Sequence, residues 1–280
     1  MNPAFSEYTG GGCLHVVVRG NDPRLSLRLS KLPGCRGVER MADDTLVLRA
    51  GTEIDIDDFL CRVLGVTTDL GAEIVEAGLG GDSERQEIII AGFKVESGTA
   101  ETAAGGPGKR NIILEPGLAF GSGRHPSTRL MGQGLAYING LVDAFPSPVL
   151  DIGCGSGILS VICARLGGRV LGLDINPAAV AGARRNVILN GLEDRVEISS
   201  EPIERLKGSF ALITANISPF VLFAIVPRLP ELLAPGGILI MAGMRDAQMD
   251  DLLNILRQTG IDGRRQVYRD GAWRGLLLET

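Results

Sequence analysis

Three glycines stand at alternate positions, Gly153, Gly155 and Gly157, a spacing that lets the backbone approach a ligand closely. An apolar run of strand length, Val149 to Ile152, comes directly before them, and apolar residues at helical spacing follow from Ile158 to Leu166. A strand, a glycine turn and a helix in this order form the opening of a βα unit. Its backbone can approach a nucleotide closely, with the amides of the helix N-terminus facing the ligand.

An acidic residue follows this unit at a suitable distance. A second apolar run, Arg169 to Leu173, ends in Asp174, which lies 21 residues after Gly153. In doubly wound folds an acid about 20 residues after the glycine turn holds the ribose. The dinucleotide fingerprint Gly-x-Gly-x-x-Gly fails at its sixth position, where Ile158 stands. The pattern beginning at Asp151, Asp-x-Gly-x-Gly-x-Gly, instead resembles motif one of class I methyltransferases, which bind S-adenosylmethionine. The bland alternative is a plain βα turn.

Length, composition and charge narrow the class of protein. The chain has 280 residues, which predicts one or two domains, and 45% of them are hydrophobic. A net charge of −5 argues against a broad phosphate-binding surface, so we expect no direct nucleic-acid partner. We recognise no signal peptide and no apolar run of about 20 residues, so we expect no membrane partner. The five cysteines include no Cys-x-x-Cys pair and are typical of reduced thiols in a cytoplasmic protein.

Residues 1–84 are predicted to form a small α+β domain. Two strands are expected at Leu14–Val18 and Thr45–Arg49, and two helices at Asp22–Lys31 and Asp55–Leu64. This region contains 8 Lys or Arg and 14 Asp or Glu, whereas the remainder contains 20 and 19. The excess of acid is most simply a solvated surface. The sharper interpretation is an acidic face that attracts a basic protein substrate.

The second predicted domain comprises residues 85–280. Its first strand is expected to begin at Glu87 and run on through Val95. Residues 97–109 are rich in Gly, Ala and Thr, which predicts a flexible hairpin tip or linker. Strand character resumes at Asn111–Leu114.

A segment before the glycine turn points to one family. Residues 111–128 read Asn-Ile-Ile-Leu-Glu-Pro-Gly-Leu-Ala-Phe-Gly-Ser-Gly-Arg-His-Pro-Ser-Thr. This segment closely resembles the pre-motif signature of the ribosomal protein L11 methyltransferase family (PrmA), and most class I methyltransferases lack it. Its Gly121-Ser122-Gly123 loop is expected either to fold over a ligand or to be an ordinary surface loop. A helix should follow, to about Ile138.

The resemblance covers residues 111–280 and implies their fold. We expect a doubly wound α/β domain with a mostly parallel, seven-stranded, Rossmann-like sheet. Its later elements are strands at Arg195–Ser199, Phe210–Ile217 and Leu233–Ile240, a helix over 246–258, and a hairpin turning at Asp270-Gly271. The resemblance does not extend to residues 1–84, the part with which the family holds its protein substrate. We therefore expect that region to recognise the substrate.

The resemblance also implies cofactor contacts, carried over to matching positions: Thr128, Gly153, Asp174 and Asn216, with Gly155 in the same turn. Asp174 can accept hydrogen bonds from both ribose hydroxyls, and Gly153 lets the chain approach without a Cβ clash. Thr128 is expected to bind the methionine end of the cofactor, or else to cap its helix. Asn216 is the expected catalytic residue, because its amide can orient both the cofactor and an incoming amine. His125 is expected to be structural rather than a base.

These residues predict an S-adenosylmethionine-dependent N-methyltransferase that acts on a lysine or another amine of a protein, a ribosomal protein in this family. The stretch Asn216-Ile-Ser-Pro differs from the Asn-Pro-Pro-Tyr motif of adenine and glutamine N-methyltransferases, which argues against a nucleic-acid base as the substrate. No metal is required, and a monomer is favoured. Four alternatives stay open: a class I methyltransferase for a small molecule, one for a different protein, a nicotinamide oxidoreductase, and a non-catalytic binding protein.

Overall fold

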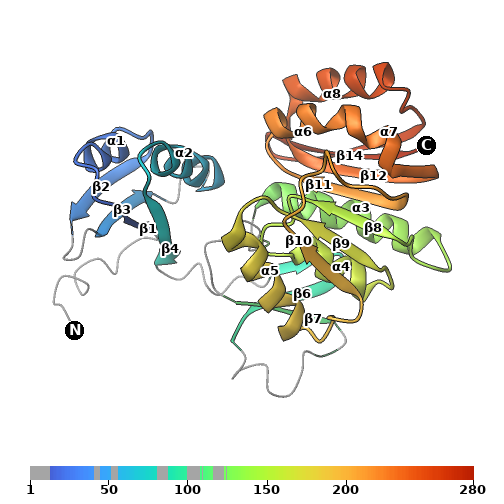
Figure 1. Ribbon diagram of the computed structural model, residues 1–280, viewed down its shortest axis with the longest axis horizontal. Coiled ribbons are helices and arrows are strands. Elements are labelled where there is room, and N and C mark those ends of the chain that lie inside the picture. Colours follow the sequence, from blue (N-terminus) through green and yellow to red (C-terminus); the bar gives the residue numbers. More distant parts are fainter. Residues whose placement is uncertain are drawn as a thin grey trace. The chain divides into compact units, whose positions relative to one another are not determined.

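The chain forms two compact units, Met1–Gln86 and Glu87–Thr280 (Figure 1). The computed structural model describes residues 13–40, 45–51, 56–80, 88–99, 108, 110–115, 123 and 125–280. The sequence placed the division two residues earlier, between 84 and 85. None of the helices in these ranges is long and apolar enough to cross a membrane.

The first unit contains an antiparallel sheet whose strands lie in the order β2 (Cys35–Arg40), β3 (Thr45–Gly51), β1 (Cys13–Arg19) and β4 (Glu73–Gly80). Two helices pack against it, α1 (Leu25–Ser30) and α2 (Ile56–Asp69). Alternate residues of β3, Leu46 and Leu48, are buried with Leu25, Leu29 and Phe59 of the helices. This alternation is what a sheet with one covered face requires. The sequence had indicated β1 and β3 but not β2 or β4.

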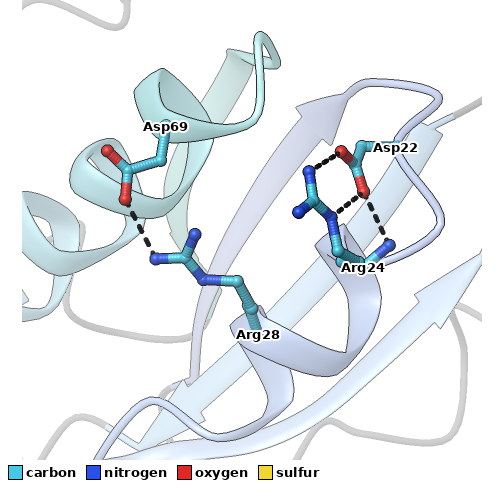
Figure 2. Close-up of polar contacts among 4 residues, drawn as sticks. All are labelled: Asp22, Arg24, Arg28 and Asp69. Atoms are coloured by element: carbon cyan, nitrogen blue, oxygen red, sulfur yellow. Dashed lines mark hydrogen bonds and ion pairs between the residues drawn. The ribbon is translucent and has the colours of Figure 1, made fainter.

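Exposed ion pairs lie at the start of α1 and between α1 and α2 (Figure 2). Asp22 accepts hydrogen bonds from the backbone N–H of Arg24, at 2.8 Å, and from its guanidinium, at 3.0 and 2.7 Å. The side-chain hydrogen bonds from Arg24 lower the pKa of Asp22 to about 2. Arg28 of α1 contacts Asp69 at the end of α2, with 3.0 Å between Nη2 and Oδ2. Because water and salt screen exposed pairs, the apolar core is the main stabiliser of this unit.

The second unit is built on a seven-stranded sheet that confirms the predicted α/β fold. Five strands run parallel in the order β10 (Val196–Ser199), β9 (Val170–Leu173), β8 (Val149–Ile152), β11 (Phe210–Asn216) and β12 (Leu233–Arg245). The hairpin β13 (Arg264–Asp270) and β14 (Trp273–Glu279) then pairs antiparallel with β12 through β14. The sheet is therefore mixed.

Helices cover both faces of this sheet (Figure 1). One face carries α3 (Pro126–Leu141), α4 (Ile158–Arg165) and α5 (Pro177–Leu189). The other carries α6 (Pro219–Ile225), α7 (Leu229–Leu232) and α8 (Asp246–Gln258). Because successive strand residues point to opposite faces, Val149 of β8 is buried against the layer of α3, α4 and α5. Leu150 is buried against the layer of α6, α7 and α8. By the same alternation, Leu212, Thr214 and Asn216 of β11 face the α3–α4 layer.

A small sheet of β5 (Ile88–Ile90), β6 (Phe93–Ser97) and β7 (Asn111–Leu114) packs in the same core as α3, α4 and α5. The single strand expected from Glu87 to Val95 is wrong, because the chain reverses at Ala91 and Gly92, whose φ angles are +50° and +81°. Two consecutive left-handed residues make the tight turn of an antiparallel hairpin.

The connection after β6 is not a hairpin tip, because β6 and β7 run parallel. Residues 100–107 and 109 lie outside the described residues, so the linker interpretation of 97–109 stays a prediction. The prediction for the Gly121-Ser122-Gly123 loop also stays a prediction, because only Gly123 of these three residues is described.

Candidate functional site

The glycine turn lies at the carboxyl end of β8. Its three glycines have left-handed backbones, with φ angles of +69°, +54° and +78° at Gly153, Gly155 and Gly157. The backbone N–H groups of Gly153 and Cys154 donate to Leu173 O at 2.8 and 2.9 Å, so β9 holds the start of the turn. A Cβ on Gly153 would lie 2.3 Å from the Ile217 side chain. Glycine is therefore required here by the protein's own packing, a reason additional to the predicted approach of a ligand.

Asp174 joins the turn to the end of β9. Its Oδ2 accepts from the Gly155 N–H and its Oδ1 from the Asn176 N–H, both at 2.9 Å. A carboxylate has about four acceptor sites, so each oxygen can take a further hydrogen bond. The side chain is half-buried and is followed by exposed residues. Asp174 can therefore fix the turn and still receive hydroxyl groups of a ligand.

Asn216 and Thr128 form a second pair at this edge of the sheet. Asn216 ends β11 and its Nδ2 donates to Thr128 Oγ1 at 3.3 Å. Thr128 is buried in the first turn of α3, where its hydroxyl can accept from Asn216 and donate elsewhere. Among the residues that the structure describes, none donates to Asn216 Oδ1. That carbonyl oxygen is available for an N–H group.

His125, not Thr128, caps α3. The Ser127 N–H donates to His125 Nδ1 at 3.2 Å, and Pro126 occupies the first helical position. The His125 ring packs edge-on against Trp273 of β14, with 4.5 Å between ring centroids. The Arg245 guanidinium lies 5.1 Å from the centre of the same indole. His125 therefore caps α3 and connects this helix to the final hairpin.

A buried carboxyl group lies under the turn. Asp151 Oδ2 accepts from Ser160 Oγ at 2.6 Å, and Oδ1 accepts from Thr214 Oγ1 at 2.9 Å. Burial raises the pKa of this carboxyl, and the two hydroxyl donors oppose that shift. The three residues connect β8, α4 and β11. They therefore fix the strand that ends in Asn216 against the strand that ends in the glycine turn.

Two residues at this edge were missed by sequence reasoning. Ile175 directly follows Asp174 and is 82% exposed, and Phe220 follows Asn216 by four positions and is 86% exposed. They are the two most exposed of the large apolar side chains described. Only their places after strand ends could have drawn attention to them, because exposure is not encoded in the residue type.

The five predicted site residues converge along one edge of the sheet. Gly153 and Gly155 follow β8, Asp174 follows β9, and Asn216 ends β11 with Thr128 bonded to it. Strand order reverses between β8 and β11, and ligands of open α/β sheets bind at such a point.

Cysteine thiols and metal-binding clusters are the other features to consider at this edge. Cys154 in the turn is buried, which raises the pKa of its thiol, so it is a turn filler rather than a nucleophile. In the part of the chain that the structure describes, no three His, Cys, Asp or Glu residues are grouped to hold a metal ion.

The fold, with these residues at the carboxyl ends of its parallel strands, is that of an α/β methyltransferase-like protein. The family model of ribosomal protein L11 methyltransferase (PrmA) matches residues 95–279, so the chain belongs to that family. The ribosomal protein L11 methyltransferases of Geotalea daltonii and Pelobacter propionicus are 35% and 40% identical over 188 and 171 residues. These matches cover 64% and 59% of this chain but only 60% and 54% of those proteins.

A solved structure agrees with the sequence relatives. The crystal structure of a ribosomal protein L11 methylase from Lactobacillus delbrueckii subsp. bulgaricus superposes with a TM-score of 0.59 at 27% identity. The superposition covers 69% of this chain and 98% of that one. The matched sequence begins 16 residues before the signature at Asn111, so the family likeness starts within β6.

Proposed function

We propose that this chain transfers a methyl group from S-adenosylmethionine to an amine of a protein. The observation that supports this proposal most is the hydrogen bond between Asn216 and Thr128 beside the glycine turn. A plain βα turn needs neither residue, and a nucleotide-binding turn needs no amide group at the end of β11. Both residues are explained when the site must hold a cofactor and orient an incoming nitrogen.

The residues present fit the cofactor. When bound, S-adenosylmethionine supplies a methyl group on a positively charged sulfur, which keeps the electron pair as the carbon–sulfur bond breaks. Asp174 would accept from the two ribose hydroxyls with the acceptor sites that Gly155 and Asn176 leave vacant. Thr128 would donate its hydroxyl proton to the methionine carboxylate, and Ile175 would cover the apolar face of the adenine.

Asn216 is proposed to orient the acceptor. Its Nδ2 is engaged by Thr128, so Oδ1 would accept an N–H of the amine and aim the nitrogen lone pair at the methyl carbon. Such positioning can contribute about 7–11 kcal/mol to a reaction between two bound partners. A lysine ammonium must first lose a proton to solvent, which costs roughly 4.6 kcal/mol at pH 7 from a pKa of about 10.4. Burial of the amine recovers part of this cost.

Ribosomal protein L11 is the proposed acceptor, because the relatives are named for it. Residues 1–84 are the proposed recognition domain. Their excess of acid, 14 against 8 basic residues, suits a basic partner such as a ribosomal protein. Methylation should then slow as salt rises, because screening weakens attraction between the two surfaces. We also propose that the protein acts in the cytoplasm and needs no nucleic acid or second copy of itself.

The test is to incubate the full chain with methyl-labelled S-adenosylmethionine and either purified ribosomal protein L11 or a cell extract. Label should enter the L11 protein, and Asn216→Ala should lower the rate by orders of magnitude while cofactor still binds. Label in a different protein would keep the reaction and replace the substrate. A labelled low-mass product would instead support the small-molecule alternative.

A further inference from the structure

Two buried asparagines lie one turn apart at the C-terminal end of α5. Asn186 is in the last turns of the helix and Asn190 is the residue directly after it, and each is 3% exposed. A buried amide group costs free energy unless it is hydrogen-bonded, so each must serve contacts that an apolar residue could not make.

Asn190 attaches α5 to the small sheet. Its Oδ1 accepts from the Ile113 N–H at 3.1 Å, and its Nδ2 donates to Ile113 O at 2.7 Å. The amide therefore pairs with β7 much as a neighbouring strand would. Its second donor bond goes to Asn186 O within α5, at 2.7 Å. None of these contacts touches the glycine turn.

Asn186 makes different contacts from the same face. Its Nδ2 donates to Ser156 O, in the middle of the glycine turn, at 2.8 Å. Its Oδ1 accepts from the Glu115 N–H, directly after β7, at 2.7 Å. One side chain thus joins the turn to the chain that leads toward α3, the helix that carries Thr128.

We propose that Asn186 is a positioning residue of the cofactor site, acting through the backbone of the glycine turn. The proposal rests on the proposed binding of S-adenosylmethionine. A turn with three left-handed glycines has many accessible conformations, so its peptide groups must be fixed from outside. Leu173 O and Asp174 fix it from the β9 side, and Asn186 fixes the Ser156 peptide from the α5 side.

Asn190 offers a matched control, because it has the same residue type and burial and lies one turn further along, directly after α5. Asn186→Ala and Asn190→Ala should both lower the melting temperature, since each removes hydrogen bonds to backbone groups of the core. Only Asn186→Ala should raise the Kd for S-adenosylhomocysteine, by about tenfold or more, and Asn190→Ala should stay within about twofold of the unaltered chain. Isothermal titration calorimetry measures both values.

Hydrogen exchange provides a readout without ligand. The amides of Gly155 and Gly157 should exchange faster in Asn186→Ala than in Asn190→Ala, because only the first frees the turn. Equal Kd values and equal exchange in the two variants would overturn the proposal and leave Asn186 a structural residue. If the unaltered chain does not bind S-adenosylhomocysteine, the proposed function fails, whereas the exchange measurement still decides the role of Asn186 in the turn.

A second variant keeps the size of the Asn186 side chain, so it tests the contact with Ser156 even if Asn186→Ala does not fold. Asn186→Asp keeps an oxygen for the Glu115 N–H but presents an acceptor to Ser156 O, where the amide donated. It should raise the Kd as much as Asn186→Ala. Binding by Asn186→Asp equal to that of the unaltered chain would show that the Ser156 contact is irrelevant, and the proposal would be wrong.

Discussion

Replacing Asp174 by Ala tests the cofactor site at the residue that the structure connects most directly to the glycine turn. The substitution removes the acceptors of the Gly155 and Asn176 N–H groups, both at 2.9 Å, together with the proposed ribose contacts. Each hydrogen bond to a charged group contributes about 1.5–3 kcal/mol. Loss of two ribose bonds at the lower value is about 3 kcal/mol, or roughly a hundredfold in Kd.

Weaker binding alone would not separate a ribose contact from a loosened turn, so the assay needs a second ligand. Calorimetric titration with S-adenosylhomocysteine and with its 2′-deoxy analogue gives a cycle of four Kd values. In the unaltered chain the deoxy analogue should bind about tenfold more weakly, because one charged hydrogen bond is missing. In Asp174→Ala that difference should vanish, since the hydroxyl no longer has its acceptor.

The two roles of Asp174 therefore predict different patterns. If the residue only holds the turn, Asp174→Ala weakens both ligands equally and the penalty for the missing hydroxyl persists. If S-adenosylhomocysteine binds Asp174→Ala as tightly as the unaltered chain, both roles are refuted. The Kd of Asp174→Asn for S-adenosylhomocysteine should lie between those of the unaltered chain and Asp174→Ala, because asparagine keeps one carbonyl oxygen but not the charge.

Three further predictions concern neighbouring residues. Thr128→Val should weaken binding of S-adenosylhomocysteine by about tenfold or more, because it removes a hydrogen bond to the charged carboxylate, whereas Thr128→Ser keeps that bond and should not. Weaker binding by Thr128→Ser but not by Thr128→Val would show that the methyl group and not the hydroxyl matters. Ile175→Ser should raise the Kd several-fold without changing the melting temperature, and Ile188→Ser, on a side chain 59% exposed, should change neither; an unchanged Kd for Ile175→Ser would remove it from the site. Burial raises the folded-state pKa of Asp151 above its unfolded value, so this carboxyl favours folding most below pH 3.8 and loses that contribution as pH rises through the raised pKa. Urea denaturation should be measured at pH values from below 3.8 to above the raised pKa. The free energy of unfolding of Asp151→Asn should rise relative to that of the unaltered chain as pH rises. The opposite trend would mean that the hydroxyl donors lower the pKa of Asp151 by more than burial raises it.

The parallel core of the second unit was predictable because its strands are short apolar runs separated by glycine turns and amphipathic helices. Buried parallel strands such as β8 and β9 carry this signal continuously. The missed strand β2 carries three charged residues and a glycine and has no fully buried position, so no apolar alternation marks it. The β5–β6 turn was missed because Ala91 takes a positive φ, which its residue type does not announce.

The candidate site was predictable where residue type carries the message. A carboxylate after β9 and glycines after β8 stand at spacings that a nucleotide site requires, and the family likeness supplied Thr128 and Asn216. Nothing in the sequence pattern marked Asn186, because its partners are backbone groups of Ser156 and Glu115, which are 30 and 71 positions away. Residues that act on backbone groups distant in the sequence are visible only once the fold brings them together.

The glycine turn and the Asn216–Thr128 pair do not carry equal weight for function. Gly153 must be glycine because Ile217 occupies the space of its Cβ, and Gly157 has a left-handed backbone beside Ala183 of α5. Such a turn would keep its glycines for packing even in a protein that had lost its ligand. The Asn216 amide, by contrast, ends β11 half-buried with an oxygen that no described residue donates to. Because the fold alone does not require that amide, variants of Asn216 test catalysis more directly than variants of the glycines, which would first disturb the packing of the turn.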